Sequence, residues 1–123
     1  MSPQLIKDKL DQMAKQPGIH GCALVDSQTG MVWMVGADTR LDLPIWEAAV
    51  DYWRLHQRHQ AVFSELGELH ALALHHTSGL LAIVPCTSEP PLLLIAHGTT
   101  RSVDWRAWQA LVHSVAQLVG DRP

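Results

Sequence analysis

The fold of this chain is decided by the stretch Gln16-Pro17-Gly18-Ile19-His20-Gly21-Cys22-Ala23-Leu24-Val25-Asp26. Pro17 and Gly18 end the preceding segment, because neither residue favours the continuation of a helix. From Ile19 to Asp26, apolar side chains then occupy both alternating positions, which is typical of a strand that is covered on both faces. We therefore expect residues 19–26 to form a central strand.

The N-terminal half of the chain supplies a helix before this strand and another strand after it. Ser2 and Pro3 are typical of a helix start, and apolar residues follow at steps of three and four. Residues 26–30 are rich in turn-forming side chains and end in a glycine. Residues 31–35 are therefore expected to return beside the central strand as the second arm of a hairpin.

The C-terminal half has the pattern of three more strands and a final helix. Apolar residues recur with a period of two through residues 69–77 and 80–86, and a further compact apolar strand covers residues 92–97. Ser102 is predicted to cap a last helix with one broad apolar face. Together with a helix predicted between the two groups of strands, this order indicates the α+β class, with an antiparallel sheet flanked by three helices.

Length and composition limit the class of protein. At 123 residues, the chain has a common size for one domain, so residues 1–123 are expected to fold as a single unit. Charged residues make up only 17%, against a usual quarter, and some apolar surface is expected to be covered by a partner.

The net charge of −3, without a cluster of Lys or Arg, argues against binding to nucleic acid or an anionic membrane. The chain has neither a signal-peptide pattern nor an apolar run near the roughly 18 residues of a membrane span, so a cytoplasmic protein is expected.

The second helix, predicted over residues 44–66 with Asp42 as its N-cap and Gly67 at its end, has an unusual distribution of side chains. At about 100° per residue, nearly all of its charges fall on one narrow stripe. This charged stripe consists of Glu47, Asp51, Arg54, Arg58 and Glu65. The other directions are apolar, and they hold Ile45, Ala49, Tyr52 and Phe63, then Trp46, Val50 and Trp53, and then Leu55, Val62 and Leu66.

A helix that rests on the sheet of its own domain buries a stripe only somewhat wider than 100°. We therefore predict that a second apolar face of this helix packs against another copy of the chain in a homodimer. The alternative is a helix buried more deeply in its own core. We assign the face around Ile45 and Tyr52 to the chain's own sheet, and Trp46, Val50 and Trp53 to the dimer interface.

The sequence offers no pattern typical of catalysis or of a metal site. His56 and His59 are one helical turn apart, but no third ligand follows at a suitable spacing. The known nucleophile, phosphate-loop and zinc-protease motifs do not occur. Cys22 and Cys86 lie in apolar segments, and we expect both to be buried, reduced thiols. We predict neither catalytic nor cofactor-binding nor metal-binding residues, and no enzyme activity.

Two stretches resemble the roadblock/dynein light chain domains. Residues 16–26, followed by Gly30, are similar to the opening of that family, in which a Pro-Gly pair precedes an apolar strand and a glycine-containing turn. Residues 79–85 and the strand from 92 to 96 are similar to its closing strands. The order of elements matches along essentially the whole chain. The tryptophans of the second helix and the proline-rich turn at 87–91 depart from the family pattern.

This resemblance implies the details of the fold and of the function. It implies a five-stranded sheet with the order 2-1-5-4-3 and the element order αββαβββα. It also implies homodimers in which the third strands pair edge to edge and the second helices pack together, which adds Leu69, Ala71 and Ala73 to the predicted interface. Family members are adaptors, and bacterial members often bind and regulate Ras-like GTPases through a surface of the dimer. Such a partner surface is assigned to Glu47, Asp51, Arg54 and Arg58.

A profilin-like sensor domain is the alternative interpretation, because its elements follow a similar order. Such a domain holds a small ligand between its sheet and its helices. Trp33, Trp105 and Trp108 are the residues that we expect to contact a ligand in that case.

Overall fold

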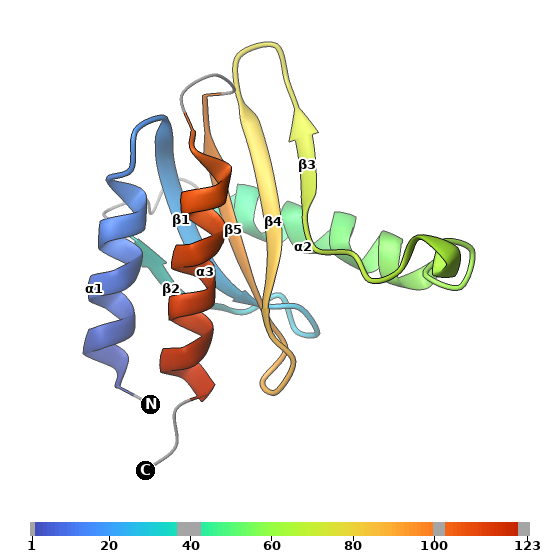
Figure 1. Cartoon of the computed structure of the whole chain (residues 1–123), viewed down its shortest axis with the longest axis horizontal. Coiled ribbons are helices and arrows are strands. Elements are labelled where there is room, and N and C mark those ends of the chain that lie inside the picture. The colour runs from blue at the N-terminus through green and yellow to red at the C-terminus, as the bar shows by residue number, and fades with distance from the viewer. Residues whose placement is uncertain (1, 37–42, 100–102, 121–123) are drawn as a thin grey trace.

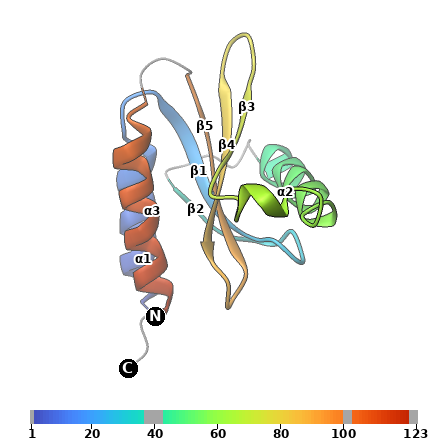
Figure 2. The same ribbon diagram turned by 45° about the vertical axis from the view of Figure 1, so that its right-hand side comes forward.

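The computed structural model describes residues 2–36, 43–99 and 103–120. One antiparallel sheet of five strands forms the centre, with the order β2-β1-β5-β4-β3 (Figure 1). The strands are β1 (Ile19–Asp26), β2 (Val32–Gly36), β3 (Leu72–His75), β4 (Leu80–Thr87) and β5 (Leu92–Gly98). Helices α1 (Pro3–Ala14) and α3 (Trp105–Gly120) cover one face of the sheet, and α2 (Leu43–Arg58) crosses the other face (Figure 2). The predicted class, sheet order and element order are confirmed.

Strand β1 is the centre of the sheet, as the two-sided apolar pattern predicts. It pairs with β2 on one side and with β5 on the other, and Ala23 lies opposite Val35 and Ile95 in the two ladders. The side chains from Cys22 to Val25 are fully buried. The turn after β1 is held by Asp26, whose carboxylate accepts hydrogen bonds from the backbone N–H groups of Gln28 at 2.8 Å and Thr29 at 2.9 Å.

The layer of α1 and α3 closes one side of the core. The two helices bury the apolar faces that the sequence predicts, formed by Ile6, Leu10, Met13, Ala14, Trp108, Val112, Val115 and Val119. The Ser2 hydroxyl accepts a hydrogen bond from the N–H of Leu5 at 3.4 Å, which confirms the predicted N-cap of α1. The N-terminal end of α3 is capped by Asp104, which accepts from the N–H of Ala107 at 3.1 Å. The expected caps Asp42 and Ser102 lie outside the described residues.

The Pro-Gly turn before β1 packs closely against the end of β5. The N–H of Thr99 donates to the carbonyl oxygen of Gly18 at 2.8 Å. A methyl group at Gly98 would overlap that carbonyl oxygen and lie 3.0 Å from the Cα atom of Ile19. Glycine is therefore required at position 98 by the close approach of two backbones.

The prediction of one helix over residues 44–66 is wrong at its C-terminal end. Helix α2 ends at Arg58, and the chain continues in turns to the short 3-10 helix η2 (Ser64–Leu66). The backbone bonds after α2 join residues three apart, such as the N–H of Val62 and the carbonyl of His59 at 2.9 Å. This tighter winding is favoured because the segment has no sheet beneath it, so no packing of a long apolar face supports a regular α-helix.

Strand β3 is also shorter than the predicted range of 69–77. Its pairing with β4 extends only from Leu72 opposite Ile83 to His75 opposite Leu80. Leu69 and Ala71 therefore precede the strand, in the connection that leads from η2 back to the sheet.

No helix in the described part of the chain has the length and apolar character needed to cross a membrane.

Candidate interaction surface

Helix α2 rests on the sheet through its tryptophan face. Trp46 is 0% exposed, Val50 is buried beside it, and Trp53 is half-buried against the same group of side chains. These residues pack against Ala23, Val25, Ile83, Leu93 and Ile95 of the sheet. The ring of Trp46 also lies 5.4 Å from the ring of His97, between ring centroids.

The predicted assignment of the helix faces is therefore wrong. Trp46 and Val50 belong to the core of one protomer, and they are not available to a second copy. Burial of the large indole removes more apolar surface from water than burial of any smaller side chain on this helix. Ala49, which is buried between them, allows the helix to approach the sheet.

The opposite face of α2 leaves an apolar stripe in solvent, and the stripe continues into the segment after the helix. The exposed fractions are 38% for Ile45, 46% for Tyr52, 49% for Leu55, 75% for Val62, 40% for Phe63 and 81% for Leu66. We call Ile45, Tyr52 and Leu55 the apolar stripe, and residues 59–68 the tail. A group of exposed large apolar side chains of this kind is typical of an interaction site.

The apolar stripe adjoins the open edge of the sheet. Strand β3 is the last strand in the sheet order, and α2 with the tail extends beyond it (Figure 1). Leu72 and Leu74 are half-buried, whereas Ala73 and His75 are exposed. Ala71 is exposed and Leu69 is half-buried just before the strand. Of the residues predicted for a dimer interface, Leu69, Ala71 and Ala73 thus lie at this open edge.

The four residues predicted for a partner surface, Glu47, Asp51, Arg54 and Arg58, are all exposed. They lie on the side of α2 that faces the β1–β2 turn, because the Arg54 guanidinium is bonded there. Its Nε donates to the carbonyl oxygen of Ser27 at 3.1 Å, and its Nη2 donates to that of Gln28. Arg54 also lies 3.8 Å from the carboxylate of Asp51.

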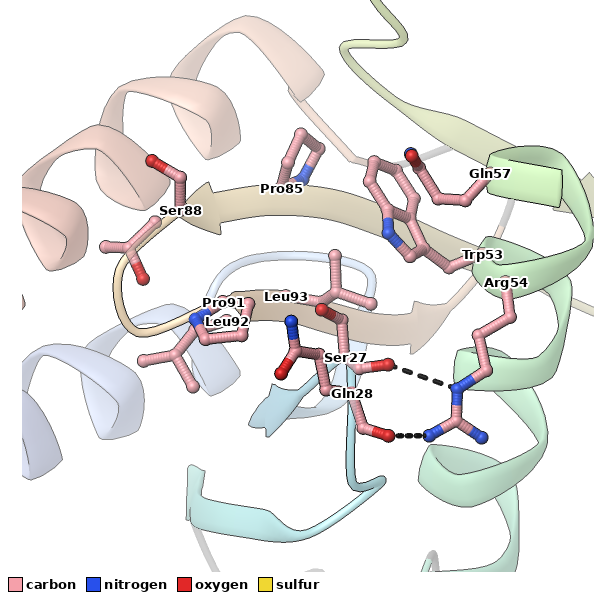
Figure 3. A pocket seen from close by; sticks show the side chains of 11 residues that line it. Ser27, Gln28, Trp53, Arg54, Gln57, Pro85, Ser88, Pro91, Leu92 and Leu93 are labelled. Carbon is pink, nitrogen blue, oxygen red and sulfur yellow. Dashed lines mark hydrogen bonds between the residues drawn. The ribbon is translucent and has the colours of Figure 1, made fainter. Parts of the chain in front are cut away.

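A hollow of about 540 Å³ lies beside this charged stripe, between α2 and the β1–β2 and β4–β5 turns (Figure 3). Its lining residues are Ser27, Gln28, Trp53, Arg54, Gln57, Pro85, Thr87, Ser88, Pro91, Leu92 and Leu93. Arg54 is the charged residue of this lining, and two of its nitrogens are already bonded to backbone carbonyls. The hollow therefore offers shape, an indole ring and neutral polar groups, and its lining contains no Asp, Glu, His, Lys or Cys side chain. The sequence did not predict it, because three distant segments form it.

A second, more apolar hollow lies on the other side of α2, and we call it the histidine hollow. It has a volume of about 380 Å³ between the N-terminal half of α2 and the β3–β4 turn. Its lining residues are His20, Ile45, Ala48, Tyr52, His76, Ser78, Gly79, Leu80, Leu81, His97 and Gly98. The rings of His20 and His97 meet edge to face, with 5.9 Å between their centroids. It shares Ile45 and Tyr52 with the apolar stripe.

Comparison with known proteins shows that the fold is a known one. No protein-family model and no curated protein sequence matches the chain. The solved Roadblock/LC7 domain from Streptomyces avermitilis is 18% identical, with a TM-score of 0.75 over 97% of this chain and 95% of that chain. MglB from Myxococcus xanthus is 12% identical, with a TM-score of 0.73 over 97% of this chain and 94% of that one. The chain has the roadblock/LC7 fold. Another MglB structure, described as a tetrameric arrangement, is 12% identical, with a TM-score of 0.72 over 94% of this chain and 88% of that chain.

In this roadblock/LC7 fold, the space between the sheet and the α1–α3 layer is occupied by side chains. Trp108 is buried in that layer, and Trp105 is half-buried with its ring 6.3 Å from that of Trp108. Trp33 is exposed on β2. The three tryptophans named for a ligand site thus do not form the walls of one cavity in the described structure: Trp108 fills the core, and none of them lines either hollow beside α2.

His56, Cys22 and Cys86 each contact another segment of the chain. His56 stacks on Phe63, with 5.3 Å between ring centroids and 13° between ring planes. Among the residues that the structure describes, no group of three or more His, Cys, Asp or Glu side chains is arranged to hold a metal ion. Cys22 is buried, as predicted, whereas Cys86 is only half-buried. Desolvation raises the pKa of each thiol to about 12, so neither is suited to act as a nucleophile near neutral pH.

Proposed function

We propose that this chain is a non-catalytic adaptor that forms a homodimer through α2 and β3 and binds a Ras-like GTPase at the dimer surface. The observation that carries the proposal is the exposed apolar stripe of α2 next to the open edge of the sheet. The roadblock/LC7 fold supports it, because the resemblance to that family implies adaptors that dimerise in this region.

A second copy of the chain covers two features of this region together. An open edge strand presents unpaired N–H and C=O groups, and an antiparallel copy of β3 pairs with them across a twofold axis. The same axis brings the apolar stripes of two α2 helices into contact. Burial of the exposed halves of Tyr52 and Leu55 contributes on the order of 1 kcal/mol per side chain.

The proposed interface consists of Tyr52, Leu55, Leu69, Ala71 and Ala73. In this interface, Tyr52 and Leu55, which are exposed on α2, take the place of the buried residues Trp46 and Val50 that the sequence predicted. Trp53 is half-buried and lies at the margin of this region, where it also lines the 540 Å³ hollow.

The partner surface is proposed to be the charged stripe of α2, with Glu47, Asp51, Arg54 and Arg58. Glu47, Arg54 and Arg58 lie on a different side of α2 from Ile45 and Tyr52, so they stay accessible when two α2 helices pack through the apolar stripe. Asp51 lies one turn before Leu55, at the border between the two surfaces. A surface with both signs of charge fixes the orientation of a partner more than it adds affinity. The adjacent hollow then receives a side chain of the GTPase beside the Trp53 indole.

Light scattering after size exclusion tests the homodimer. The wild-type chain is expected to show twice the mass of one 13.6 kDa protomer. Leu55→Glu is expected to give a folded monomer, because position 55 is exposed on the isolated protomer and tolerates a charge there. Arg58→Glu on the same helix is the matched control and should remain a dimer. A monomeric wild-type chain contradicts the proposal.

Binding to a GTPase is tested separately, by calorimetry with the Ras-like GTPases of the same genome in their GDP and GTP forms. A Glu47→Lys, Arg58→Glu double variant reverses two charges of the stripe and is expected to lower affinity while the protein stays dimeric. Equal affinity of the wild type and the variant for the bound GTPase would exclude the charged stripe as the contact surface.

A further inference from the structure

We infer that, in the dimer, the tail of each copy occupies the histidine hollow of the other copy. The inference rests on the proposed homodimer and adds a specific, reciprocal contact to it. Each protomer then contributes both an inserted segment and the site that receives it.

The tail is a projecting segment with unusual apolar exposure. Val62 and Leu66 are more exposed than any other large apolar side chain of the described residues. The segment nevertheless has defined turns, since the N–H of Leu66 donates to the carbonyl of Phe63 at 2.9 Å and that of Gly67 donates to Ser64 at 3.1 Å. Stacking of Phe63 on His56 fixes the tail to the end of α2. A preformed segment loses little conformational entropy when it binds.

The histidine hollow has the position that such a tail requires. Helix α2 crosses the sheet and continues past β3, so the tail lies outside the edge of its own sheet (Figure 1). A twofold-related copy at this edge directs its tail back across β3 and β4 of the first chain. The hollow opens there, with His76, Gly79 and Leu81 in its lining.

The spacing along α2 agrees with a reciprocal contact. Two α2 helices that pack antiparallel about Leu55 place residues equally far before and after position 55 next to one another. Ala48 of the hollow precedes Leu55 by seven residues, 55 − 48, and Val62 of the tail follows it by seven, 62 − 55. At 1.5 Å per residue, each lies roughly 10 Å from the axis, although the winding changes after Arg58.

The chemistry of the two surfaces is complementary. The tail combines apolar Val62 and Leu66 with the carboxylates of Glu65 and Glu68, and residues 59–68 contain neither Lys nor Arg. The hollow combines apolar walls with the imidazoles of His20 and His76. An imidazole N–H donates a hydrogen bond to a carboxylate, and a protonated ring adds an opposite charge. The tail of a second copy therefore matches both the apolar walls and the imidazoles of His20 and His76.

Cross-linking between singly substituted chains tests the contact directly. Leu66→Cys on the tail and Ser78→Cys at the rim of the hollow are prepared separately, with one of the two carrying an affinity tag. After subunit exchange and treatment with a short bismaleimide, the mixture is expected to give a covalent pair of tagged and untagged chains. Leu66→Cys mixed with Glu47→Cys, on the charged stripe, is the matched control and should give none.

The dissociation constant of the dimer supplies a second measurement. Ala48→Trp fills the hollow from an exposed position on α2, so it is expected to leave the circular dichroism of the protomer unchanged and to weaken the dimer at least about tenfold. Leu66→Gln on the tail should weaken it in the same way, and the two changes combined should cost less than the sum of their separate effects.

Several outcomes would overturn the inference. A wild-type dimer in which Leu66→Cys and Ser78→Cys do not cross-link, or in which Ala48→Trp leaves the dissociation constant unchanged, refutes tail insertion while the proposed dimer stands. A small molecule that native mass spectrometry detects on the wild-type dimer and that Ala48→Trp displaces also refutes it. A monomeric wild-type chain refutes the dimer and the insertion together, so the two failures are distinguishable.

Discussion

Trp46 provides the sharpest test of which face of α2 belongs to the core. A tryptophan at a dimer interface can be truncated without unfolding the protomer, whereas a tryptophan at the centre of the core cannot. The structure places Trp46 at 0% exposure against the sheet, with His97 in ring contact. Trp46→Ala therefore removes a complete indole from a closed site and leaves a cavity.

The expected cost follows from that burial. Replacement of a buried tryptophan by alanine destabilises a protein by about 3–5 kcal/mol. A domain of this length has a free energy of unfolding of roughly 6–18 kcal/mol, so Trp46→Ala is expected to remove a large part of it and to lower the melting temperature by more than about 10 °C. Tyr52→Ala, on the exposed face of the same helix, should cost the protomer less than about 1 kcal/mol, because nearly half of that side chain is in solvent.

Urea unfolding followed by far-ultraviolet circular dichroism measures both variants, at several protein concentrations. The concentration series is needed because association adds to apparent stability. We expect Trp46→Ala to lower stability strongly at every concentration, and Tyr52→Ala to lower it mainly where the wild type is associated. A Trp46→Ala protein that keeps its unfolding free energy and becomes monomeric would refute the core assignment.

Three further predictions concern the protomer itself. Cys22 and Cys86 should resist Ellman's reagent at pH 8 in the native protein and react fully in urea, because burial raises the pKa of each thiol to about 12; rapid native reaction would contradict this. Hydrogen bonds from backbone N–H groups lower the pKa of Asp26, so its carboxylate stabilises the fold above the ordinary pKa near 4 and loses this effect as pH falls through the lowered value. Asp26→Asn should thus be less stable than wild type by less than about 1 kcal/mol at pH 7, and the difference should vanish in acid urea titrations; a constant difference would exclude the charge as its cause. Gly98→Ala should destabilise by about 1–3 kcal/mol in thermal melts, because a methyl group there overlaps the carbonyl of Gly18; an unchanged melting temperature would show that the turn moves freely.

The course of the main chain was largely predictable from local patterns. The two-sided apolar run of β1 identified it as the central strand, and Ser2 with Pro3 identified the start of α1. Those features depend on residues that are neighbours in the sequence, and their physical causes are equally local. The strand order came from the family resemblance, because no local pattern states which strands are adjacent.

For helix α2, the local sequence pattern did not identify which apolar face is buried. Its sequence has more than one apolar face, and periodicity cannot rank faces that are all apolar. Only the position of the sheet decided that Trp46 and Val50 are buried while Tyr52 and Leu55 remain exposed. The same limit explains the predicted continuation to residue 66: the pattern continues, but the sheet that would support a helix ends before the tail.

The sequence by itself determined the class, the succession of helices and strands, and the excess of apolar surface on the second helix, because these follow from side-chain type and spacing. The tertiary structure alone decided which apolar face is free, how far β3 extends, and where hollows form beside α2. These properties depend on segments such as the β1–β2 turn, the β3–β4 turn and α2, which are distant in the sequence and meet only when the sheet has formed.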